Sequence, residues 1–285
     1  MKKYLSALVL SGAVLALAAC GSDEDKKDSG SSTGSGDAKE DVTLVIGASA
    51  GLHDLILEEA APILAEEGIE LDIKPYTEYV MPNQDLDSGD LDANYFQHVP
   101  YLNNQVKEHG YEFENAGGVH VEPMGIYSSK YKSVEEIPDG ATIIISNSVA
   151  EQGRILSLLE ASGLIKLKEG VDKTAATLDD IAENPKNLVI DADSNPEILT
   201  TYLQNDEGDA VVINANFIID AGMNPTEDSI ALEGAESDYV NIITVRAGDE
   251  KREEIQRLVE VLQSEEIADF ILEEWDGAVV PVGKQ

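Results

Sequence analysis

The densest group of side chains suited to molecular recognition lies between Tyr76 and Tyr101. This stretch holds four of the ten tyrosines, one of the four phenylalanines and one of the four histidines, in a chain that is only 5% aromatic. Because Pro82, Gly89 and Pro100 interrupt regular structure, we expect the rings to lie on loops and short turns. Loops that carry aromatic and polar groups commonly form small-molecule sites, so the stretch predicts a binding pocket; an aromatic core cluster beneath a loop is the alternative.

A second motif would suit a nucleophile. Residues 47–51, Gly-Ala-Ser-Ala-Gly, match the G-x-S-x-G elbow of serine hydrolases and follow a predicted strand. Such an enzyme needs earlier strands to supply a second oxyanion donor, whereas Ser49 lies on the first predicted strand and no His-Gly-Gly-Gly run precedes it. Nothing singles out His98, His109 or His120 as the base. We favour a small-residue turn whose helix amides face an anion or water, and keep the hydrolase as an alternative.

Four aspartates in the aromatic stretch suggest a calcium loop at first sight: Asp85, Asp87, Asp90 and Asp92. The position of Gly89 and the missing glutamate at the twelfth position break the EF-hand pattern, which favours a solvated helix and turn. The histidines are not spaced as a zinc site, and Cys20 is the only cysteine. We therefore predict no metal and no other cofactor.

Two polar residues downstream could hold the polar end of a small molecule. Arg154 lies in a predicted helix beside apolar Ile155 and is one of only 19 basic residues. Its guanidinium could fork onto a carboxylate, or it could be a surface residue paired with Glu151. Asn214 follows the apolar strand 210–213. Open α/β sheets bind ligands at such strand ends, although a cap or turn residue is the alternative there.

Two sets of alternating strands and helices would carry these residues. The hydrophobic pattern predicts strands at 42–47, 69–73, 142–146, 187–191 and 209–214, and helices at 55–64, 101–109, 152–162 and 253–270. The opening β-α-β order favours a parallel sheet with a covering helix. Extended segments near 120–128 and 240–246 would connect the sets. We expect an α/β fold with lobe 1 at 42–121 and 243–285, lobe 2 at 122–242, and two hinge crossover strands.

The amino terminus predicts export and a lipid anchor. Two lysines precede an apolar run that ends at Ala19, the pattern of a signal peptide at 1–19 and too short to span a membrane. The run ends in Leu-Ala-Ala-Cys-Gly, similar to the bacterial lipobox, in which cleavage exposes the cysteine, here Cys20, for attachment of diacylglycerol and an acyl chain such as palmitate. An unlipidated secreted protein with a free thiol is the alternative. Residues 20–41 predict a flexible acidic Gly/Ser tether on the extracytoplasmic face of the cell membrane.

The net charge of the chain argues against some classes of binding partner. The formal net charge is −37, from 56 acidic and 19 basic residues. Nucleic acid would repel such a chain, so we exclude nucleic-acid binding. We interpret the acidity as a highly solvated surface rather than a metal store.

Five segments resemble a known family. They are Glu-Tyr-Val-Met-Pro-Asn at 78–83, Gly-Asp-Leu-Asp-Ala-Asn-Tyr-Phe-Gln-His-Val-Pro-Tyr-Leu at 89–102, Val-Glu-Pro-Met-Gly-Ile-Tyr-Ser at 121–128, Gly-Leu-Ile-Lys-Leu-Lys at 163–168 and Glu-Asn-Pro-Lys-Asn-Leu at 183–188. With the lipobox, they resemble the NlpA-type methionine-binding lipoproteins from about residue 42 to the C-terminus. Members of that family are substrate-binding proteins of ABC importers, which capture methionine outside the cell and deliver it to a membrane permease with its ATPase.

The resemblance implies a type II periplasmic-binding-protein-like fold and a pocket for an amino acid, L-methionine first. The first lobe would surround the thioether and the ligand's polar end with Tyr79, Phe96, His98 and Tyr101. From the second lobe, Arg154 would hold the α-carboxylate and Asn214 would hydrogen-bond the α-amino-acid group. No catalytic residue is implied, so we expect a binding protein and not an enzyme.

One segment departs from the family pattern. The chain has Asp-Ala-Asp-Ser-Asn-Pro-Glu at 191–197, where many members have Glu-x-Ala-x-Gln-Leu-Pro-Arg. A methionine derivative, another apolar amino acid or a short peptide therefore stays open as the ligand. A lipid-anchored serine hydrolase using Ser49 and a surface adhesin with a vestigial pocket are the alternative functions.

Overall fold

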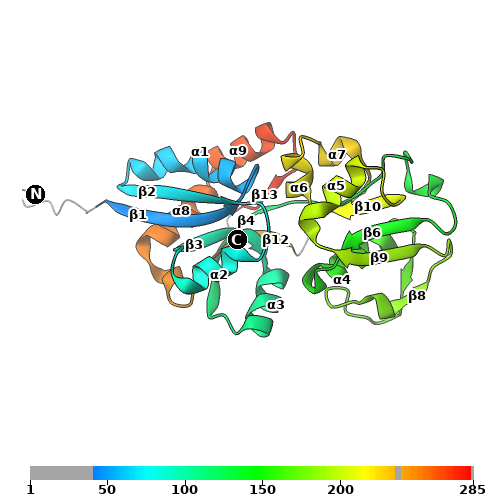
Figure 1. Cartoon of the computed structure of the whole chain (residues 1–285). Helices are drawn as coiled ribbons and strands as arrows, with labels where there is room; N and C mark the ends of the chain where they lie inside the picture. Colours follow the sequence, from blue (N-terminus) through cyan, green and yellow to red (C-terminus); the bar gives the residue numbers. More distant parts are fainter. Residues whose placement is uncertain (1–40, 235–238, 284–285) are drawn as a thin grey trace, which may run out of the picture. The chain divides into compact units, whose positions relative to one another are not determined.

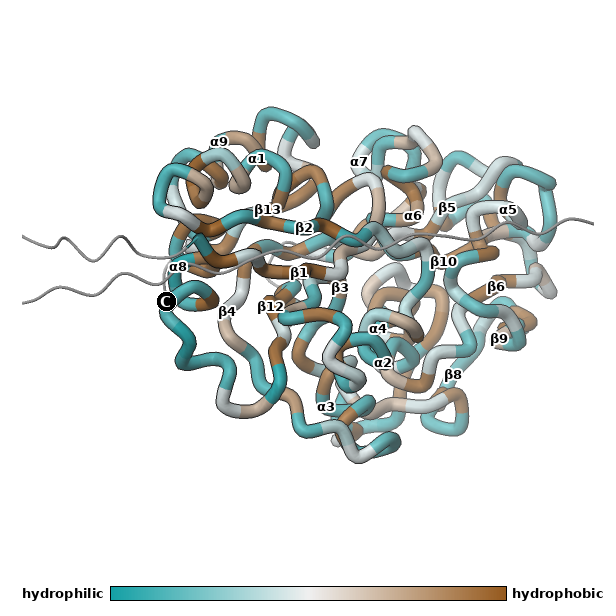
Figure 2. The backbone as a smooth tube through the Cα atoms, turned by 60° about the vertical axis from the view of Figure 1, so that its left-hand side comes forward, coloured by the Kyte–Doolittle hydropathy of each residue, from teal (hydrophilic) through white to brown (hydrophobic). Residues whose placement is uncertain are grey.

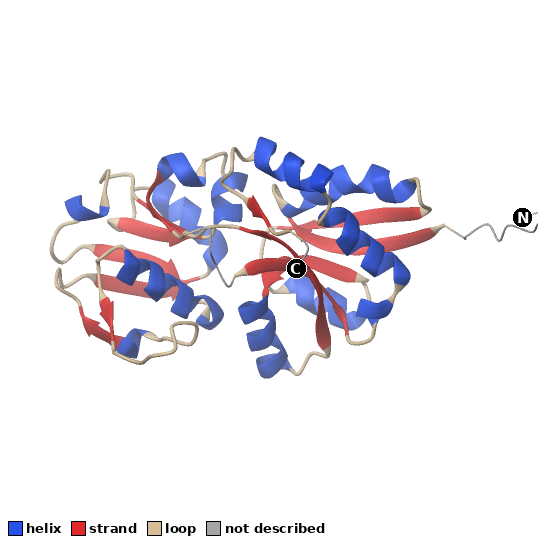
Figure 3. Ribbon diagram, turned by 180° about the vertical axis from the view of Figure 1, so that it is seen from behind, coloured by secondary structure: helices blue, strands red, loops and turns tan. Residues whose placement is uncertain are grey.

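The computed structural model describes residues 41–234 and 239–283. Its strands form two large sheets, each at the centre of one lobe, and a small ribbon (Figures 1 and 3). The first sheet has the order β13-β4-β12-β3-β1-β2, and the second has the order β11-β5-β10-β6-β9. The ribbon pairs β7 (Lys166–Leu167) with β8 (Ile181–Glu183).

Lobe 1 is built on the first sheet. Its strands are β1 (Val42–Ser49), β2 (Ile69–Tyr76), β3 (Ala93–His98), β4 (Phe113–Val121), β12 (Val240–Arg246) and β13 (Val280–Pro281). Its helices are α1 (His53–Ala65), α2 (Met81–Ser88), α3 (Val99–His109), α8 (Glu253–Leu262) and α9 (Glu265–Glu274), with a 3₁₀ turn η4 (Asp249–Lys251). β1 runs parallel to β2 and β3, which confirms the predicted β-α-β opening. One core joins α1, α8 and α9 to this sheet through residues such as Leu57, Leu258 and Ile267.

Lobe 2 is built on the second sheet. Its strands are β5 (Gly125–Tyr127), β6 (Thr142–Ser146), β9 (Val189–Ser194), β10 (Ala210–Ile213) and β11 (Ser229–Leu232). Its helices are α4 (Val149–Ala161), α5 (Leu199–Gln204), α6 (Ala215–Asp220) and α7 (Pro225–Asp228), with 3₁₀ turns η1 (Val134–Glu136), η2 (Leu178–Asp180) and η3 (Pro196–Ile198). Alternate residues of β6 enter different cores: Ile143 packs with α4, and Ile144 packs with α5 and α6. Hydrophobic (brown) segments mark central strands such as β1 and β10 in Figure 2.

The two sheets share one topology. The order β2-β1-β3-β12-β4 in lobe 1 corresponds to the order β9-β6-β10-β5-β11 in lobe 2. In both, the fourth strand of this series belongs in sequence to the other side of a crossover. The inserted strand is β12 in lobe 1 and β5 in lobe 2, and each is antiparallel to its neighbours. The chain therefore passes between the lobes twice, after β4 and before β12. This confirms the predicted two-lobed α/β fold with two crossovers. The exact residues at which the lobes begin and end stay a prediction. Strand β12 pairs with β4 of lobe 1 from Val240, three residues before the predicted return to lobe 1 at 243.

The prediction that the aromatic stretch lies on loops is wrong for most of it. Residues 81–88 form α2, 93–98 form β3, and 99–109 form α3. Pro82 and Pro100 each occupy the first turn of a helix, where the missing N–H has no intrahelical partner to lose. Gly89 ends α2 with a φ of 87°, a backbone conformation that glycine adopts without strain. The prolines therefore start helices instead of breaking them.

The predicted single helix at 253–270 is also wrong, because two helices, α8 and α9, cover this region. The chain turns at Gln263 and Ser264, and the Ser264 hydroxyl accepts a hydrogen bond from the backbone N–H of Ile267. A serine in this role is a common helix N-cap. The apolar stripe continues through both helices because both face the same core.

Candidate functional site

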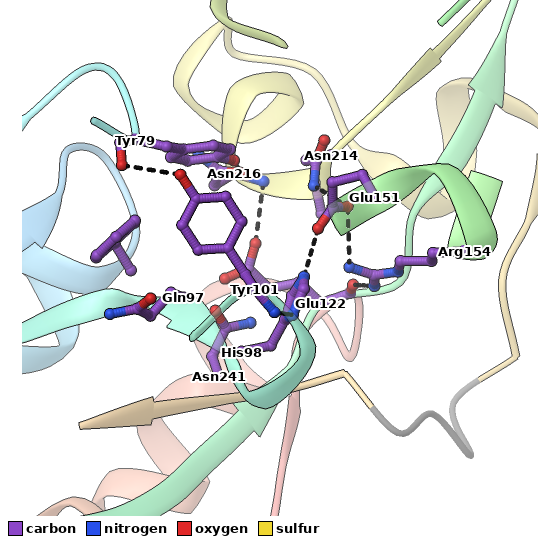
Figure 4. Close-up of a pocket in the computed structure, with 12 residues that line it drawn as sticks. Tyr79, Gln97, His98, Tyr101, Glu122, Glu151, Arg154, Asn214, Asn216 and Asn241 are labelled. Carbon is purple, nitrogen blue, oxygen red and sulfur yellow. Dashed lines mark hydrogen bonds and ion pairs between the residues drawn. The ribbon is translucent and has the colours of Figure 1, made fainter. Parts of the chain in front are cut away.

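A narrow pocket, partly open to solvent, lies between the two lobes (Figure 4). All six ligand-binding residues predicted from the sequence line it: Tyr79, Phe96, His98 and Tyr101 from lobe 1, and Arg154 and Asn214 from lobe 2. The other lining residues are Gln97, Glu122, Glu151, Ala215, Asn216 and Asn241. Residues 191–197, where the sequence departs from the family pattern, do not line this pocket.

Aromatic rings form one wall. The ring of Tyr79, which follows β2, lies 5.9 Å from that of Phe96 and 5.0 Å from that of Phe217, measured between centroids. Phe96 meets Tyr101 edge-on at 5.9 Å. Such a wall suits an apolar or polarizable group of a ligand.

Tyr79 also makes a polar link between the lobes. Its hydroxyl donates to Asn216 Oδ1 at 2.6 Å, and the Tyr101 hydroxyl donates to the Tyr79 carbonyl at 3.1 Å. Burial, and then the nearby Glu122 and Glu151, raise the pKa of Tyr79 well above its ordinary value. The phenol therefore stays protonated and remains a donor.

His98 and Glu151 form a second link between the lobes. His98 begins α3 as its N-cap, and its Nδ1 accepts from the Tyr101 backbone N–H at 3.2 Å. The ring hydrogen therefore lies on Nε2, which donates to Glu151 Oε1 at 2.5 Å. Glu151 Oε2 accepts from Asn214 Nδ2 at 3.1 Å. Burial alone would raise the pKa of Glu151, but its interactions with His98, Arg154 and Asn214 lower it to about 2.

Arg154 is buried, with 4% of its surface exposed, so the surface alternative is wrong. Its Nε and Nη2 donate to Glu233 Oε2 at 3.1 and 2.6 Å, and Nη2 also donates to the Glu122 carbonyl at 2.7 Å. The guanidinium lies 4.5 Å from the centre of the Tyr239 ring. Nη1 lies 3.8 Å from Glu151 Oε2 and makes no hydrogen bond within residues 41–234 and 239–283. Nη1 can therefore donate to an incoming carboxylate.

Glu122 is a pocket residue that the sequence prediction missed. It follows β4 in the first crossover and is 6% exposed. Its Oε1 accepts from His120 Nε2 at 2.8 Å and from His53 Nε2 at 3.1 Å, and its Oε2 accepts from the Asn216 backbone N–H at 3.2 Å. Burial alone would raise the pKa of Glu122, but the two histidines lower it well below its usual range. The side chain is therefore a carboxylate anion held by both lobes.

Glu122, His53 and His120 are also the group in the described part of the chain that could hold a metal ion. One ligand atom from each lies within 4.8 Å of the other two, and all three residues are buried. The hydrogen bonds described above already use the same atoms, and the Tyr95 hydroxyl lies on the other ring nitrogen of His120. The absence of a metal stays a prediction.

The sequence contains only weak indications of the other polar pocket residues that the prediction missed. Gln97 lies inside the motif that carries Phe96 and His98, and Asn216 is the polar residue in the otherwise apolar start of α6. Glu151 was considered only as a surface partner for Arg154. Asn241 lies on β12, which pairs with His98 on β3. Each of these polar side chains is buried, which the sequence alone does not show.

The serine motif forms no hydrolase site in the described structure. Ser49 ends β1 and is 3% exposed, and the motif closes at Gly51 with a φ of 82°. No hydrogen bond joins Ser49 to a histidine among the residues described. His53, the histidine that begins the following helix, is directed at Glu122 and Asn241. The motif is therefore a strand-to-helix turn.

The four aspartates lie on and after α2, as the solvated-turn interpretation expects. Asp92 accepts from the Val45 backbone N–H at 2.9 Å and pairs with Arg252 at 2.9 Å. Cys20, the predicted signal peptide and all of the predicted tether except Asp41 lie outside the described residues. None of the described helices has the length and apolar character needed to cross a membrane.

Comparison with known proteins agrees with this geometry. The NlpA lipoprotein family matches residues 44–283. The methionine-binding lipoprotein MetQ of Bacillus subtilis is 46% identical, with both chains covered in full. Two solved structures superpose closely: a pheromone precursor and lipoprotein of the YaeC family from Enterococcus faecalis, and a nutrient-binding protein from Burkholderia cenocepacia bound to methionine. The first has a TM-score of 0.82 at 54% identity and covers 84% of this chain and 100% of that one. The second has a TM-score of 0.79 at 40% identity and covers 84% of this chain and 99% of that one. The chain therefore belongs to the NlpA lipoprotein family.

Proposed function

We propose that this lipoprotein captures methionine outside the cell and delivers it to the permease of an ABC importer. The observation that carries the proposal is the pocket between the lobes, which joins an aromatic wall to a buried arginine and two buried carboxylates. Relatives named as methionine-binding, and a structural neighbour that holds methionine, support the same ligand. The family is one of binding lipoproteins rather than enzymes, which leaves no support for the hydrolase.

The pocket offers a partner for each end of methionine. The thioether would lie against Tyr79, Phe96 and Tyr101, where each sulfur–aromatic contact contributes about 0.3–1.5 kcal/mol. The α-carboxylate would meet Arg154 at Nη1, the edge that makes no hydrogen bond in the described structure. Asn214 would hydrogen-bond the α-amino-acid group after the ligand displaces part of its contact with Glu151.

The departure at 191–197 does not argue against methionine. Asn195, Pro196 and Glu197 line a separate outer groove, together with Tyr79 and Tyr101. The inner pocket thus keeps the residues that the family resemblance implies. A ligand longer than one amino acid would have to extend into that groove.

The two lobes give the receptor a way to sequester its ligand. The Tyr79–Asn216 and His98–Glu151 hydrogen bonds join the lobes directly, so they form when the lobes come together. A ligand that contacts both lobes would favour that state over an open one, because it gains contacts only on closure. The permease and its ATPase would then accept the closed, loaded form.

Titration calorimetry tests the ligand. Protein stripped of co-purified small molecules by unfolding and refolding is titrated with L-methionine, D-methionine and the other standard amino acids. We expect heat and a rise in melting temperature with methionine, and weak or no response to charged amino acids. A protein that binds none of them would contradict the proposal and leave the adhesin alternative.

We also propose that Cys20 carries the lipid that places the protein on the extracytoplasmic face of the cell membrane. The support is the lipobox and membership of a lipoprotein family. Wild-type protein expressed in a bacterial host should be recovered with the membrane fraction, and Cys20→Ala should be released from it. Equal partitioning of the two forms would contradict the anchor without affecting the ligand proposal.

A further inference from the structure

We propose that Glu122 selects ligands that carry a free α-ammonium group, and that His53 and His120 position its carboxylate for this task. The proposal rests on the proposed function, because it assigns a partner to one end of the amino acid. None of these three residues is among the ligand-binding residues predicted from the sequence.

The position of Glu122 is fixed from both lobes. His53 in α1 and His120 in β4 donate to Oε1, whereas the backbone N–H of Asn216, in α6, donates to Oε2. The Glu122 carbonyl accepts from Arg154. A carboxylate held this firmly offers its remaining lone pair in one direction.

The hydrogen-bond pattern sets the ring hydrogens of both histidines. His53 Nδ1 is buried and has no partner among the described residues, so a hydrogen there would be an unsatisfied donor. The hydrogen of His53 therefore belongs on Nε2, which faces Glu122 Oε1. The Tyr95 hydroxyl can donate to Nδ1 of His120, which places that ring's hydrogen on Nε2 as well. Both rings thus donate from Nε2 to the same carboxylate oxygen.

Acidic side chains outnumber basic ones around the pocket in the described structure. Glu122, Glu151 and Glu233 surround a single guanidinium, that of Arg154, whose forked contact is with Glu233. Glu151 lies 3.8 Å from Arg154 Nη1 and also accepts from His98 and Asn214. In the described structure the side chain of Glu122 receives hydrogen bonds from two histidine rings and one backbone N–H, and none from an arginine or a lysine. Arg154 acts on the Glu122 carboxylate only through space, so an ammonium brought by the ligand could donate directly to the carboxylate and would be favoured there.

Arg154 and Glu122 are also neighbours in the pocket wall. An α-amino acid carries its ammonium and carboxylate on one carbon, so the two partners in the protein must lie side by side. Arg154 Nη2 lies 2.7 Å from the Glu122 carbonyl oxygen, which puts the guanidinium and the Glu122 residue next to each other in the pocket wall. Arg154 would hold the carboxylate while Glu122 holds the ammonium.

Two ligands that differ only at this group test the proposal. Calorimetry at pH 7 compares L-methionine with its α-hydroxy analogue, 2-hydroxy-4-(methylthio)butanoate, which keeps the thioether and the carboxylate. We expect the wild type to bind methionine at least 30-fold more tightly than the hydroxy acid. In Glu122→Gln this ratio should fall by at least tenfold, because methionine loses more affinity than the hydroxy acid.

Variants at the neighbouring residues separate selection from a general structural role. Glu151→Gln is the matched control, since Glu151 is also buried in the same pocket. Both ligands should weaken together in this variant, and the ratio should persist. His120→Gln should lower the ratio less than Glu122→Gln does, since one donor to the carboxylate remains. A persistent ratio in Glu122→Gln, or its loss in Glu151→Gln instead, would overturn the proposal.

The wild type alone keeps the proposal falsifiable if Glu122→Gln does not fold. Nearly equal wild-type affinities for methionine and the hydroxy acid would overturn it. If the wild type binds neither ligand, the proposed function fails and this inference fails with it. If it binds methionine but Glu122→Gln keeps the ratio, only the role of Glu122 is lost.

Discussion

His98 Nε2 lies 2.5 Å from Glu151 Oε1, so a buried hydrogen bond joins the N-cap residue of α3 in lobe 1 to α4 in lobe 2. Both partners line the pocket, and neither is more than 6% exposed. The contact therefore couples the distance between the lobes to the state of the binding site. Because the same carboxylate also accepts from Asn214, a ligand that reaches Asn214 acts on this link too.

Acid should weaken the protein through Glu151. Its pKa is lowered from 4.5 to about 2 in the folded protein, so the unfolded chain binds more protons in this range. The stabilisation is present above pH 4.5 and is lost as the pH falls toward 2. We expect Glu151→Gln to melt below the wild type at pH 7 and the gap to narrow as the pH falls to 3. Thermal unfolding of both proteins across this range measures the gap, and a gap independent of pH would contradict the assignment.

Replacing Arg154 should weaken methionine binding at least tenfold, about 1.4 kcal/mol or more. Arg154→Ala removes the buried group that the ligand carboxylate would meet and leaves Glu233 without its forked partner. Arg154→Lys keeps the charge but loses the planar fork, so it should restore only part of the affinity. Calorimetry measures both variants, with circular dichroism as the check on folding. Full affinity in Arg154→Lys would show that charge alone suffices.

Asn214→Ala should also weaken methionine binding at least tenfold. The variant removes the amide that bridges Glu151 and the proposed ligand group at the end of β10. Asn195→Ala is the matched control, because Asn195 lines the outer groove rather than the pocket and should change affinity less than twofold. Unchanged affinity in both Arg154→Ala and Asn214→Ala would mean that the ligand binds elsewhere.

Much of the fold could be predicted because apolar residues recur along the chain with the spacing of buried strands and helices. Strand β6 appears at Thr142–Ser146, the range that its run of isoleucines predicts, and both crossovers lie where extended segments were expected. The errors have local causes that hydrophobic periodicity does not record. The prolines at 82 and 100 are compatible with a first helical turn, and a serine hydroxyl at 264 divides one apolar stripe between two helices.

The residues of the candidate site could be predicted only where they lie in, or are implied by, the segments that resemble a known family. All six predicted ligand-binding residues line one pocket, but Glu122 and Glu151 were not among them. A glutamate reads as a surface residue until its partners are known, and the partners of Glu122 come from α1, β4 and α6. Only the folded chain shows that His53 and His120 donate to that buried carboxylate.

Tyr79 and Asn216 should be energetically coupled across the lobes. The Tyr79 hydroxyl donates to Asn216 Oδ1 at 2.6 Å, and Tyr79→Phe removes this donor while it keeps the ring against Phe96 and Phe217. We expect Tyr79→Phe and Asn216→Ala each to weaken methionine binding, because each removes a contact that forms only when the lobes close. The double variant should lose less than the sum of the two losses, with a coupling of about 0.5–1.5 kcal/mol, typical of one hydrogen bond. Calorimetry on the four proteins gives the coupling directly. A value indistinguishable from zero would show that this hydrogen bond does not contribute to closure around the ligand.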